Sequence, residues 1–188
     1  MAYELKSARF LVQDALRRHL FEGSTAVDCT AGNGHDTCFL ASLCGESGHV
    51  YAFDIQASAL ASAAALLEKE GLSRRVTLIR DGHEHLLSHV SGPVDAVMFN
   101  LGWLPGGDKS VTTLWDTTRE AVSAGLSILR KGGLMTVCVY PGHGEGAVER
   151  DRLRETLSAL RPQEYNALHC VFANAGPGAP ECWIIQKQ

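Results

Sequence analysis

The sequence lacks several features that would place it in other classes of protein. No apolar run approaches the roughly 20 residues that a membrane-spanning helix needs, and the segment Met1–Lys6 contains no apolar signal core. We therefore expect a cytoplasmic protein without a membrane partner. Internal repeats, low-complexity segments and an interdomain linker are also missing, so residues 1–188 predict a single domain with a sizeable core.

Basic residues are not in excess. The chain has 17 Lys and Arg against 21 Asp and Glu, which gives a formal net charge of −4. This balance argues against broad, nonspecific binding of nucleic acid, but it leaves room for a local basic patch.

Metal-binding patterns are missing as well. The six cysteines form no C-x-x-C pair, so we expect neither a disulfide framework nor a zinc site, and most cysteines should be small buried hydrophobic residues. His35, His83 and His85 have no spacing that supports a metal ion.

Short apolar strands alternate with helical patterns, which is typical of a parallel α/β sheet. The predicted strands are 24–30, 49–54, 75–80, 94–100, 134–140, 167–173 and 182–187. The predicted helices are 4–20, which packs on the rest as an N-terminal helix, 36–43, 57–70, 83–89, 112–129 and 146–160. Because residues 174–180 supply no crossover helix, the last two strands must pair antiparallel or diverge.

Two details of this pattern concern the later helices. The run Lys131-Gly132-Gly133 predicts the end of the helix at 112–129. The spacing of the apolar residues in 146–160 predicts an inward face, made of Val148, Leu153, Leu157 and Leu160.

The most informative segment is the turn Asp28-Cys29-Thr30-Ala31-Gly32-Asn33-Gly34-His35-Asp36-Thr37. Glycines let the backbone adopt φ > 0 and pass close to a ligand, and a helix N-terminus presents unpaired N–H groups to that ligand. The turn resembles motif I of class I S-adenosylmethionine (AdoMet) methyltransferases, which implies AdoMet as the cofactor.

A dinucleotide-binding oxidoreductase is the alternative for this turn. The fingerprint G-x-G-x-x-G lacks its third glycine, because Thr37 stands at that position. The carboxylate of Asp28 would repel a pyrophosphate and attract a cationic ligand such as a sulfonium. Both observations favour AdoMet over NAD.

Acidic residues end the next two strands, where ligands of parallel sheets bind. Asp54 can accept hydrogen bonds from both ribose hydroxyls, or it can cap the following helix. The resemblance to methyltransferases places Asp81 at the adenine amino group, with a helix cap again as the alternative. The candidate cofactor-binding residues are Asp28, Thr30, Gly32, Asn33, Gly34, His35, Asp36, Thr37, Asp54, Gln56, Asp81, His83 and Asn100.

The fourth strand runs into the loop Asn100-Leu101-Gly102-Trp103-Leu104-Pro105-Gly106-Gly107-Asp108-Lys109. Such a loop at the catalytic edge is typical of a functional segment. Its start resembles the Asn/Asp-Pro-Pro-aromatic loop of amino-group methyltransferases. That implies an Asn100 carbonyl that orients a target amine and a Trp103 ring that stacks on a planar base. Alternatively, Trp103 only plugs the end of the sheet.

The remaining candidate catalytic residues lie around that loop. The fifth strand ends in Tyr140-Pro141-Gly142-His143, which can wall a substrate pocket. Asp108 or His143 could relay a proton, and Lys109 could contact a backbone phosphate. A lone loop histidine is also commonly a surface residue, so both interpretations of His143 stay open.

The turn at 28–37, the loop at 100–109 and the segment 140–143 together resemble a small bacterial family labelled putative rRNA methylases, and the run Leu-Pro-Gly-Gly-Asp-Lys is specific to it. The resemblance implies a Rossmann-like class I fold, with a seven-stranded, mostly parallel sheet, an antiparallel C-terminal strand and helices on both faces. It departs at residues 174–178, which are poor in Asn for the family.

The same resemblance implies an activity and a partner. Members of the family methylate the amine of 5-aminomethyl-2-thiouridine at the wobble position, in the anticodon region of tRNA. Methylation of rRNA or of a small molecule is the alternative, and a noncatalytic AdoMet- or RNA-binding module would not need the loop at 100–109. A homodimer could widen the surface for tRNA.

Overall fold

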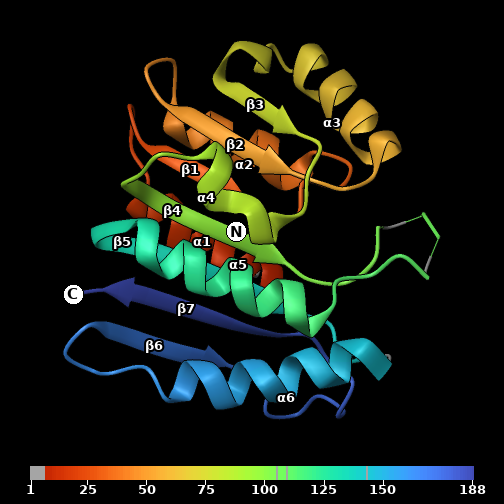
Figure 1. The fold of residues 1–188 in the computed structure, drawn as a ribbon, viewed down its shortest axis with the longest axis vertical. Helices are drawn as coiled ribbons and strands as arrows, with labels where there is room; N and C mark the ends of the chain where they lie inside the picture. The colour runs from red at the N-terminus through yellow and green to blue at the C-terminus, as the bar shows by residue number, and fades with distance from the viewer. Residues whose placement is uncertain (1–6, 105, 109, 143) are drawn as a thin grey trace.

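Seven strands form one sheet in the order β3-β2-β1-β4-β5-β7-β6 (Figure 1). The computed structural model describes residues 7–104, 106–108, 110–142 and 144–188. The strands are β1 (Thr25–Asp28), β2 (His49–Phe53), β3 (Val76–Ile79), β4 (Val94–Asn100), β5 (Leu129–Val139), β6 (Tyr165–Cys170) and β7 (Glu181–Lys187). Only β7 is antiparallel to its neighbours, β5 and β6, which confirms the predicted sheet.

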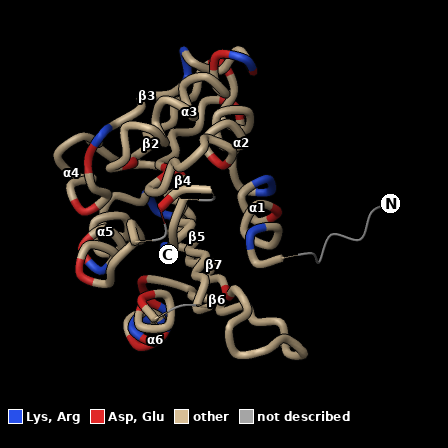
Figure 2. Tube along the Cα trace, turned by 90° about the vertical axis from the view of Figure 1, so that its right-hand side faces the viewer, with Lys and Arg blue, Asp and Glu red and all other residues tan. Residues whose placement is uncertain are grey.

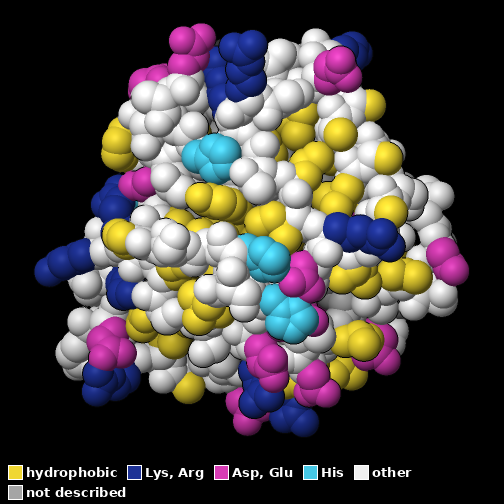
Figure 3. All heavy atoms as spheres, turned by 45° about the horizontal axis from the view of Figure 1, so that its top comes forward, with side chains coloured by type: hydrophobic (Ala, Val, Ile, Leu, Met, Phe, Trp, Pro, Cys, Tyr) yellow, Lys and Arg dark blue, Asp and Glu magenta, His cyan; other side chains and the backbone are white. Residues whose placement is uncertain are grey.

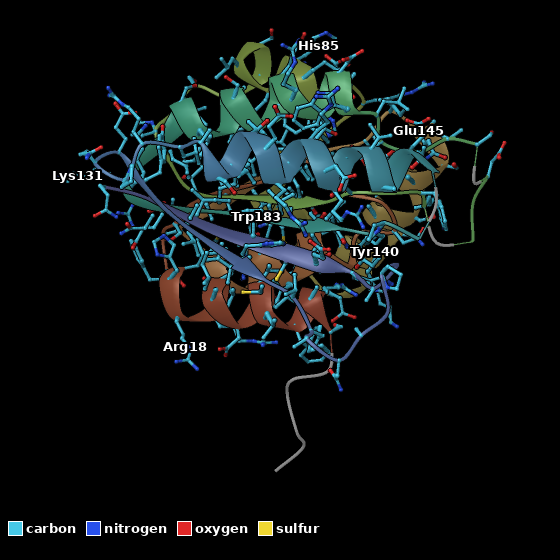
Figure 4. The ribbon with its side chains drawn as sticks, turned by 90° about the horizontal axis from the view of Figure 1, so that it is seen from below. Arg18, His85, Lys131, Tyr140, Glu145 and Trp183 are labelled. Atoms are coloured by element: carbon cyan, nitrogen blue, oxygen red, sulfur yellow. The ribbon has the colours of Figure 1, made fainter. Side chains whose placement is uncertain are left out.

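Helices cover both faces of the sheet, as predicted. They are α1 (Ala8–His19), α2 (His35–Cys44), α3 (Ala57–Lys69), α4 (Leu86–His89), α5 (Trp115–Ile128) and α6 (Gly144–Ser158), with short 3₁₀ turns η1 (Ser73–Arg75) and η2 (His83–His85). One apolar layer joins the sheet to α1, α2 and α3, and the other joins it to α4, α5 and α6. Figures 2 and 4 show α1 on the opposite side of the sheet from α5 and α6. Among the described helices, none is long and apolar enough to cross a bilayer.

Helix α1 begins where its sequence supplies a cap. The side chain of Ser7 accepts a hydrogen bond from the backbone N–H of Phe10, which satisfies one of the unpaired donors of the first turn. Ala8, Val12 and Leu16 are buried, one helical turn apart, and the helix packs on β5 and β7. The first part of the predicted helix, residues 4–6, lies outside the described residues.

Strand β4 is buried on both faces because its side chains alternate between the two apolar layers. Val97 and Phe99 pack in the layer of α5, whereas Ala96 and Met98 pack in the layer of α1. The strand therefore runs through the centre of the core and delivers its last residue, Asn100, to the carboxyl edge of the sheet.

The helix end is predicted to within one residue, but Lys131-Gly132-Gly133, the residues expected to stop the helix, lie in β5, which begins at Leu129 and not at the predicted residue 134. Helix α5 ends at Ile128, and residues 130–133 bulge out where β5 passes Asp95 of β4. Gly132 has φ +77°, which glycine adopts at little cost. The side chains of Arg130 and Asp95 form an ion pair across the bulge.

The predicted inward face of α6 is partly wrong. Leu153 and Leu157 are buried as expected, but the Val148 side chain is 47% exposed and Glu149 is fully buried instead. The burial of Glu149 is tolerated because its carboxylate accepts two hydroxyl hydrogen bonds from other elements. Leu160 follows the end of the helix and packs partly buried against the same layer.

Candidate active site

A cavity of about 630 Å³ opens at the carboxyl ends of β1, β2 and β4. Small-molecule sites typically have volumes of roughly 300–1,000 Å³. The cavity lies where the strand order reverses between β1 and β4, the usual place for a ligand in such sheets. The predicted cofactor residues that line it are Thr30, Gly32, Asn33, His35, Asp36, Asp54, Gln56, Asp81, His83 and Asn100.

Asp28 and Thr37 shape the turn from behind the cavity and do not line it. Asp28 is fully buried, and its carboxylate accepts hydrogen bonds from the Thr30 backbone N–H at 3.1 Å and the Thr37 hydroxyl at 2.7 Å. Burial raises the pKa of Asp28 to about 7, and the negative charge of Asp36 adds to this rise. These contacts hold the turn in place.

The two glycines of the turn, Gly32 and Gly34, have different structural roles. Gly32 lines the cavity with φ +50°, and its N–H donates to Asp54 Oδ2 at 2.9 Å. Gly34 has φ +86°, and a Cβ at this position would lie 2.7 Å from the Cα of Ala63 in α3. Gly34 therefore lets two helices approach closely, and it does not line the cavity where the prediction placed it.

Asp54 lines the cavity and also organises the chain before α3. Its Oδ2 accepts the Gly32 N–H, and its Oδ1 accepts the Gln56 N–H at 2.8 Å. Each carboxylate oxygen has a second lone pair, which can accept a hydrogen bond from a hydroxyl group. The geometry thus combines the capping role with an acceptor that fits the two hydroxyls of a ribose.

Asp81 stands at the rim with both oxygens engaged. His85 Nδ1 lies 2.8 Å from Asp81 Oδ1, and His89 Nε2 lies 2.8 Å from Asp81 Oδ2. These contacts hold the pKa of the Asp81 carboxyl well below its usual range, and they raise the pKa of His85. Figure 3 shows histidine and acidic side chains side by side on the face drawn there. An adenine amino group would have to share Asp81 with these imidazoles.

His83 offers a second acceptor at the cavity. Its Nδ1 lies 3.0 Å from the carbonyl oxygen of Cys29, and because a carbonyl only accepts, this ring nitrogen carries the proton. Burial lowers the pKa of His83, so its imidazole is neutral near pH 7 and Nε2 has a free lone pair. Such a nitrogen can accept a hydrogen bond from an amino group.

Two hydrogen bonds hold Asn100 at the cavity. Its backbone N–H donates to the Thr30 hydroxyl at 2.8 Å, and its Nδ2 donates to Asp36 Oδ2 at 3.2 Å. Its Oδ1 is buried without a hydrogen-bond partner among the described residues. Asp36 Oδ1 in turn binds Arg9 Nη2 at 2.9 Å and Gln13 Nε2 at 2.8 Å, both from α1.

Trp103 and Tyr140 form part of the cavity wall. Trp103 is half-buried and makes an isolated antiparallel bridge with Thr112. Tyr140, labelled in Figure 4, lies against Gly102, where an added Cβ would be 3.9 Å from the tyrosine ring. Burial raises the pKa of Tyr140 to about 12, so its hydroxyl keeps its proton near neutral pH.

Of the other predicted catalytic residues, the structure describes only Asp108, and it does not bring Asp108 to the cavity. Asp108 is exposed and absent from the lining. Its carboxylate accepts the Ser110 N–H at 2.9 Å, which lowers its pKa. Lys109 and His143 lie outside the described residues. Within the described part of the chain, no group of three or more His, Cys, Asp or Glu side chains could hold a metal ion.

Arg9, which lines the cavity, and Glu149, which bonds to the lining residue Thr113 from outside it, are two residues that the sequence analysis does not identify. Arg9 stands 27 positions before Asp36 in a separate helix, and no local pattern links the two. Glu149 falls on a helix face that apolar spacing alone describes incorrectly. Glu149 stands four residues before Leu153, on the helix face that Leu153 and Leu157 define, and this spacing is the sequence signal that could have indicated it.

The strand order, the turn after β1 and the acid that ends β2 define a class I AdoMet-dependent methyltransferase fold. The residues fit this cofactor, since among the described contacts Asp54 keeps lone pairs for a ribose and His83 Nε2 keeps an acceptor. A family model described as putative rRNA methylase matches residues 50–186. The chain belongs to this family.

Several relatives support the assignment. A putative rRNA methylase structure from Clostridium thermocellum has a TM-score of 0.96 and 39% identity, covering 99% of this chain and 100% of that one. A putative methyltransferase from Streptococcus mutans, in complex with SAH, has a TM-score of 0.89 and 34% identity over 98% and 99% of the two chains.

A curated relative from Arabidopsis thaliana, a chloroplastic tRNA (mnm(5)s(2)U34)-methyltransferase, is 41% identical over 74% of this chain and 54% of its own length. The chain therefore spans about half the length of that relative. A tRNA 5-carboxymethoxyuridine methyltransferase from Escherichia coli K12 is 28% identical over 63% of this chain and 41% of its own length.

Proposed function

We propose that this chain transfers the methyl group of AdoMet to the amine of 5-aminomethyl-2-thiouridine at the tRNA wobble position. The product is 5-methylaminomethyl-2-thiouridine. The names of the two curated relatives, both tRNA-uridine methyltransferases, support this substrate class. Asn100 Oδ1, which is buried and has no hydrogen-bond partner in the described part of the chain, is the observation that carries the choice of an amine.

An amine needs an acceptor that orients it without keeping it charged. Asn100 Oδ1 is such an acceptor, because an amide oxygen is neutral and takes one N–H of the substrate. The nitrogen lone pair is then left to face the methyl group. AdoMet supplies a methyl on positively charged sulfur. As the N–C bond formed, the C–S bond would break with the electron pair staying on sulfur, and the new secondary ammonium would then release a proton to solvent.

The charge near Asn100 is balanced, which also favours a neutral amine. An isolated carboxylate at Asp36 would stabilise the ammonium form, which has no lone pair. Arg9 cancels this charge, with Nε and Nη2 at 3.0 and 2.9 Å from Asp36 Oδ1. The amine therefore meets a polar wall with little net charge, and partial burial in the cavity lowers its pKa further.

The partner is proposed to be the anticodon region of tRNA, with its modified base in the cavity, whose wall includes the aromatic ring of Trp103. Lys and Arg are interspersed with Asp and Glu along the chain, and Figure 3 shows them scattered over one face. A limited contact fits this pattern better than a broad basic track. We also propose that residues 1–188 act as one domain in the cytoplasm, and that a homodimer would enlarge the contact.

Nucleoside mass spectrometry tests the proposed reaction. The protein and AdoMet are incubated with tRNA that carries 5-aminomethyl-2-thiouridine, and in parallel with rRNA from a strain that lacks the enzyme. We expect a gain of one methyl group on the modified uridine and none in rRNA. Methylation of rRNA alone, or of neither RNA, would contradict the proposal.

A further inference from the structure

The buried carboxylate of Glu149 lies outside the cavity lining but is linked to it by hydrogen bonds. Its Oε2 accepts the Thr113 hydroxyl at 2.6 Å, and its Oε1 accepts the Thr118 hydroxyl at 2.6 Å. Glu149 belongs to α6, Thr118 to α5, and Thr113 to the segment that enters α5. The Glu149 side chain thus connects α6 by hydrogen bonds both to α5 and to the segment before α5.

Thr113 passes this connection on to the cavity. Its hydroxyl accepts the Gly102 N–H at 3.0 Å, and its own N–H donates to the Gly102 carbonyl at 3.2 Å. A hydroxyl has one proton, and Thr113 donates it in a hydrogen bond to the Glu149 carboxylate. The lone pairs of the Thr113 hydroxyl oxygen are therefore left for the Gly102 N–H. Gly102 lies two residues after Asn100 and next to Trp103.

We propose that Glu149 is a positioning residue for methyl transfer. It fixes the Thr113 hydroxyl, closes the loop base (Gly102, Trp103, Thr112 and Thr113) and so holds Asn100 and Trp103 in place. The loop base leaves β4 and returns to α5, and α5 lies beside α6 (Figure 1). This inference rests on the proposed function for its kinetic test, but its structural test does not require a substrate.

The structural test measures backbone hydrogen exchange in the unliganded protein. Thr113→Val keeps the shape of the side chain and removes the hydroxyl that links Glu149 to Gly102. We expect exchange at Gly102 and Thr113 to speed up by about tenfold or more in Thr113→Val and Glu149→Leu, with exchange in β1 unchanged. Thr118→Val removes the other partner of Glu149 and should leave the loop base much less affected. Wild-type exchange in Thr113→Val would overturn the inference.

The kinetic test separates positioning from simple stability. A small displacement of a reacting group lowers turnover by about tenfold to a hundredfold, so we expect that fall in kcat for Thr113→Val and Glu149→Leu, with AdoMet Kd within about twofold. Glu149→Gln and Thr113→Ser keep an acceptor or the hydroxyl and should restore kcat to within about threefold. Leu153→Ala creates a cavity beneath the same helix, α6. This variant should have a lower Tm, and its kcat per folded molecule should be unchanged.

The outcomes distinguish the two proposals. If wild-type protein does not methylate the modified tRNA, the proposed function fails, and the exchange experiment still decides the role of Glu149. If the wild type is active and the kcat losses merely follow the fall in Tm, including that of Leu153→Ala, Glu149 has only a structural role and the inference is wrong.

Discussion

Asn100 and Asp36 are joined by a hydrogen bond of 3.2 Å that fixes which end of the Asn100 amide is left for a ligand. A carboxylate oxygen only accepts, so the atom that faces Asp36 Oδ2 must be the amide nitrogen. The amide oxygen is then buried and without a partner among the described residues. A buried acceptor in that state costs free energy until a donor arrives, and a substrate amine would provide one.

The first prediction concerns this acceptor. Asn100→Ala should lower kcat by about a hundredfold, because the amine loses the group that orients it, while AdoMet Kd stays within about threefold. Asn100→Asp keeps the shape, but its negative charge lies beside Asp36 and favours the ammonium form. Its kcat should therefore recover at higher pH. Single-turnover methylation and calorimetry measure the two parameters, and an equal loss of both in Asn100→Ala would refute the assigned role.

The second prediction concerns the charge of Arg9. In Arg9→Gln the carboxylate of Asp36 loses its cation and raises the pKa of the substrate amine, so the rising limb of the pH–rate profile should move upward by about one unit. Arg9→Lys keeps a cation and should shift the limb less. Gln13→Leu removes a neutral bond from α1 to the same oxygen. It serves as the matched control, and a shift of equal size in this variant would show that the effect comes from α1 docking.

The third prediction concerns Asp54 and the ribose. Asp54→Ala should raise AdoMet Kd by about tenfold to a hundredfold, since hydrogen bonds to a charged acceptor contribute about 1.5–3 kcal/mol each, with kcat at saturating AdoMet reduced only a few-fold. Calorimetry with an analogue that lacks the ribose hydroxyls tests the cause. Wild-type protein should lose affinity for this analogue, and Asp54→Ala should bind both ligands alike. Unchanged AdoMet affinity in the variant would remove the ribose role.

Local sequence signals were enough for most of the fold and for part of the site. The strand at 94–100 has its predicted bounds, because the apolar run 96–99 is typical of a strand buried on both faces. Acidic residues and glycines at strand ends located the cavity, because a parallel sheet brings all of these ends to one edge. The loop at 100–109 predicts in the same way that Asn100 lies at this edge, and Asn100 lines the cavity.

Contacts between distant segments could not be predicted from the same signals. The hydrogen bond from Arg9 to Asp36 joins residues 27 positions apart in different helices. Glu149 is buried because the hydroxyls of Thr113 and Thr118, which lie in another part of the chain, donate to its carboxylate. The spacing of apolar residues within α6 contains no information about these partners, and it therefore predicts Val148 on the inward face. The strand β5 begins five residues before its predicted start, because residues 130–133 form a bulge whose existence depends on pairing with β4.

The last prediction follows from the raised pKa of Asp28, about 7 against an ordinary value of 3.8. Between these two pH values the folded protein keeps the Asp28 proton and the unfolded chain has lost it. The unfolded state then binds fewer protons, so the free energy of unfolding falls as the pH rises through this window and levels off above it.

Asp28→Asn isolates this effect, because it removes the ionisable group. Urea unfolding at pH 5 and pH 8 should show the wild type losing up to about 3 kcal/mol more than the variant, since one pKa unit corresponds to about 1.4 kcal/mol. Other groups with shifted pKa values, such as Glu149 and Asp81, are present in both proteins and cancel in the comparison. Equal losses in the two proteins would mean that the Thr30 and Thr37 hydrogen bonds keep Asp28 ionised at both pH values.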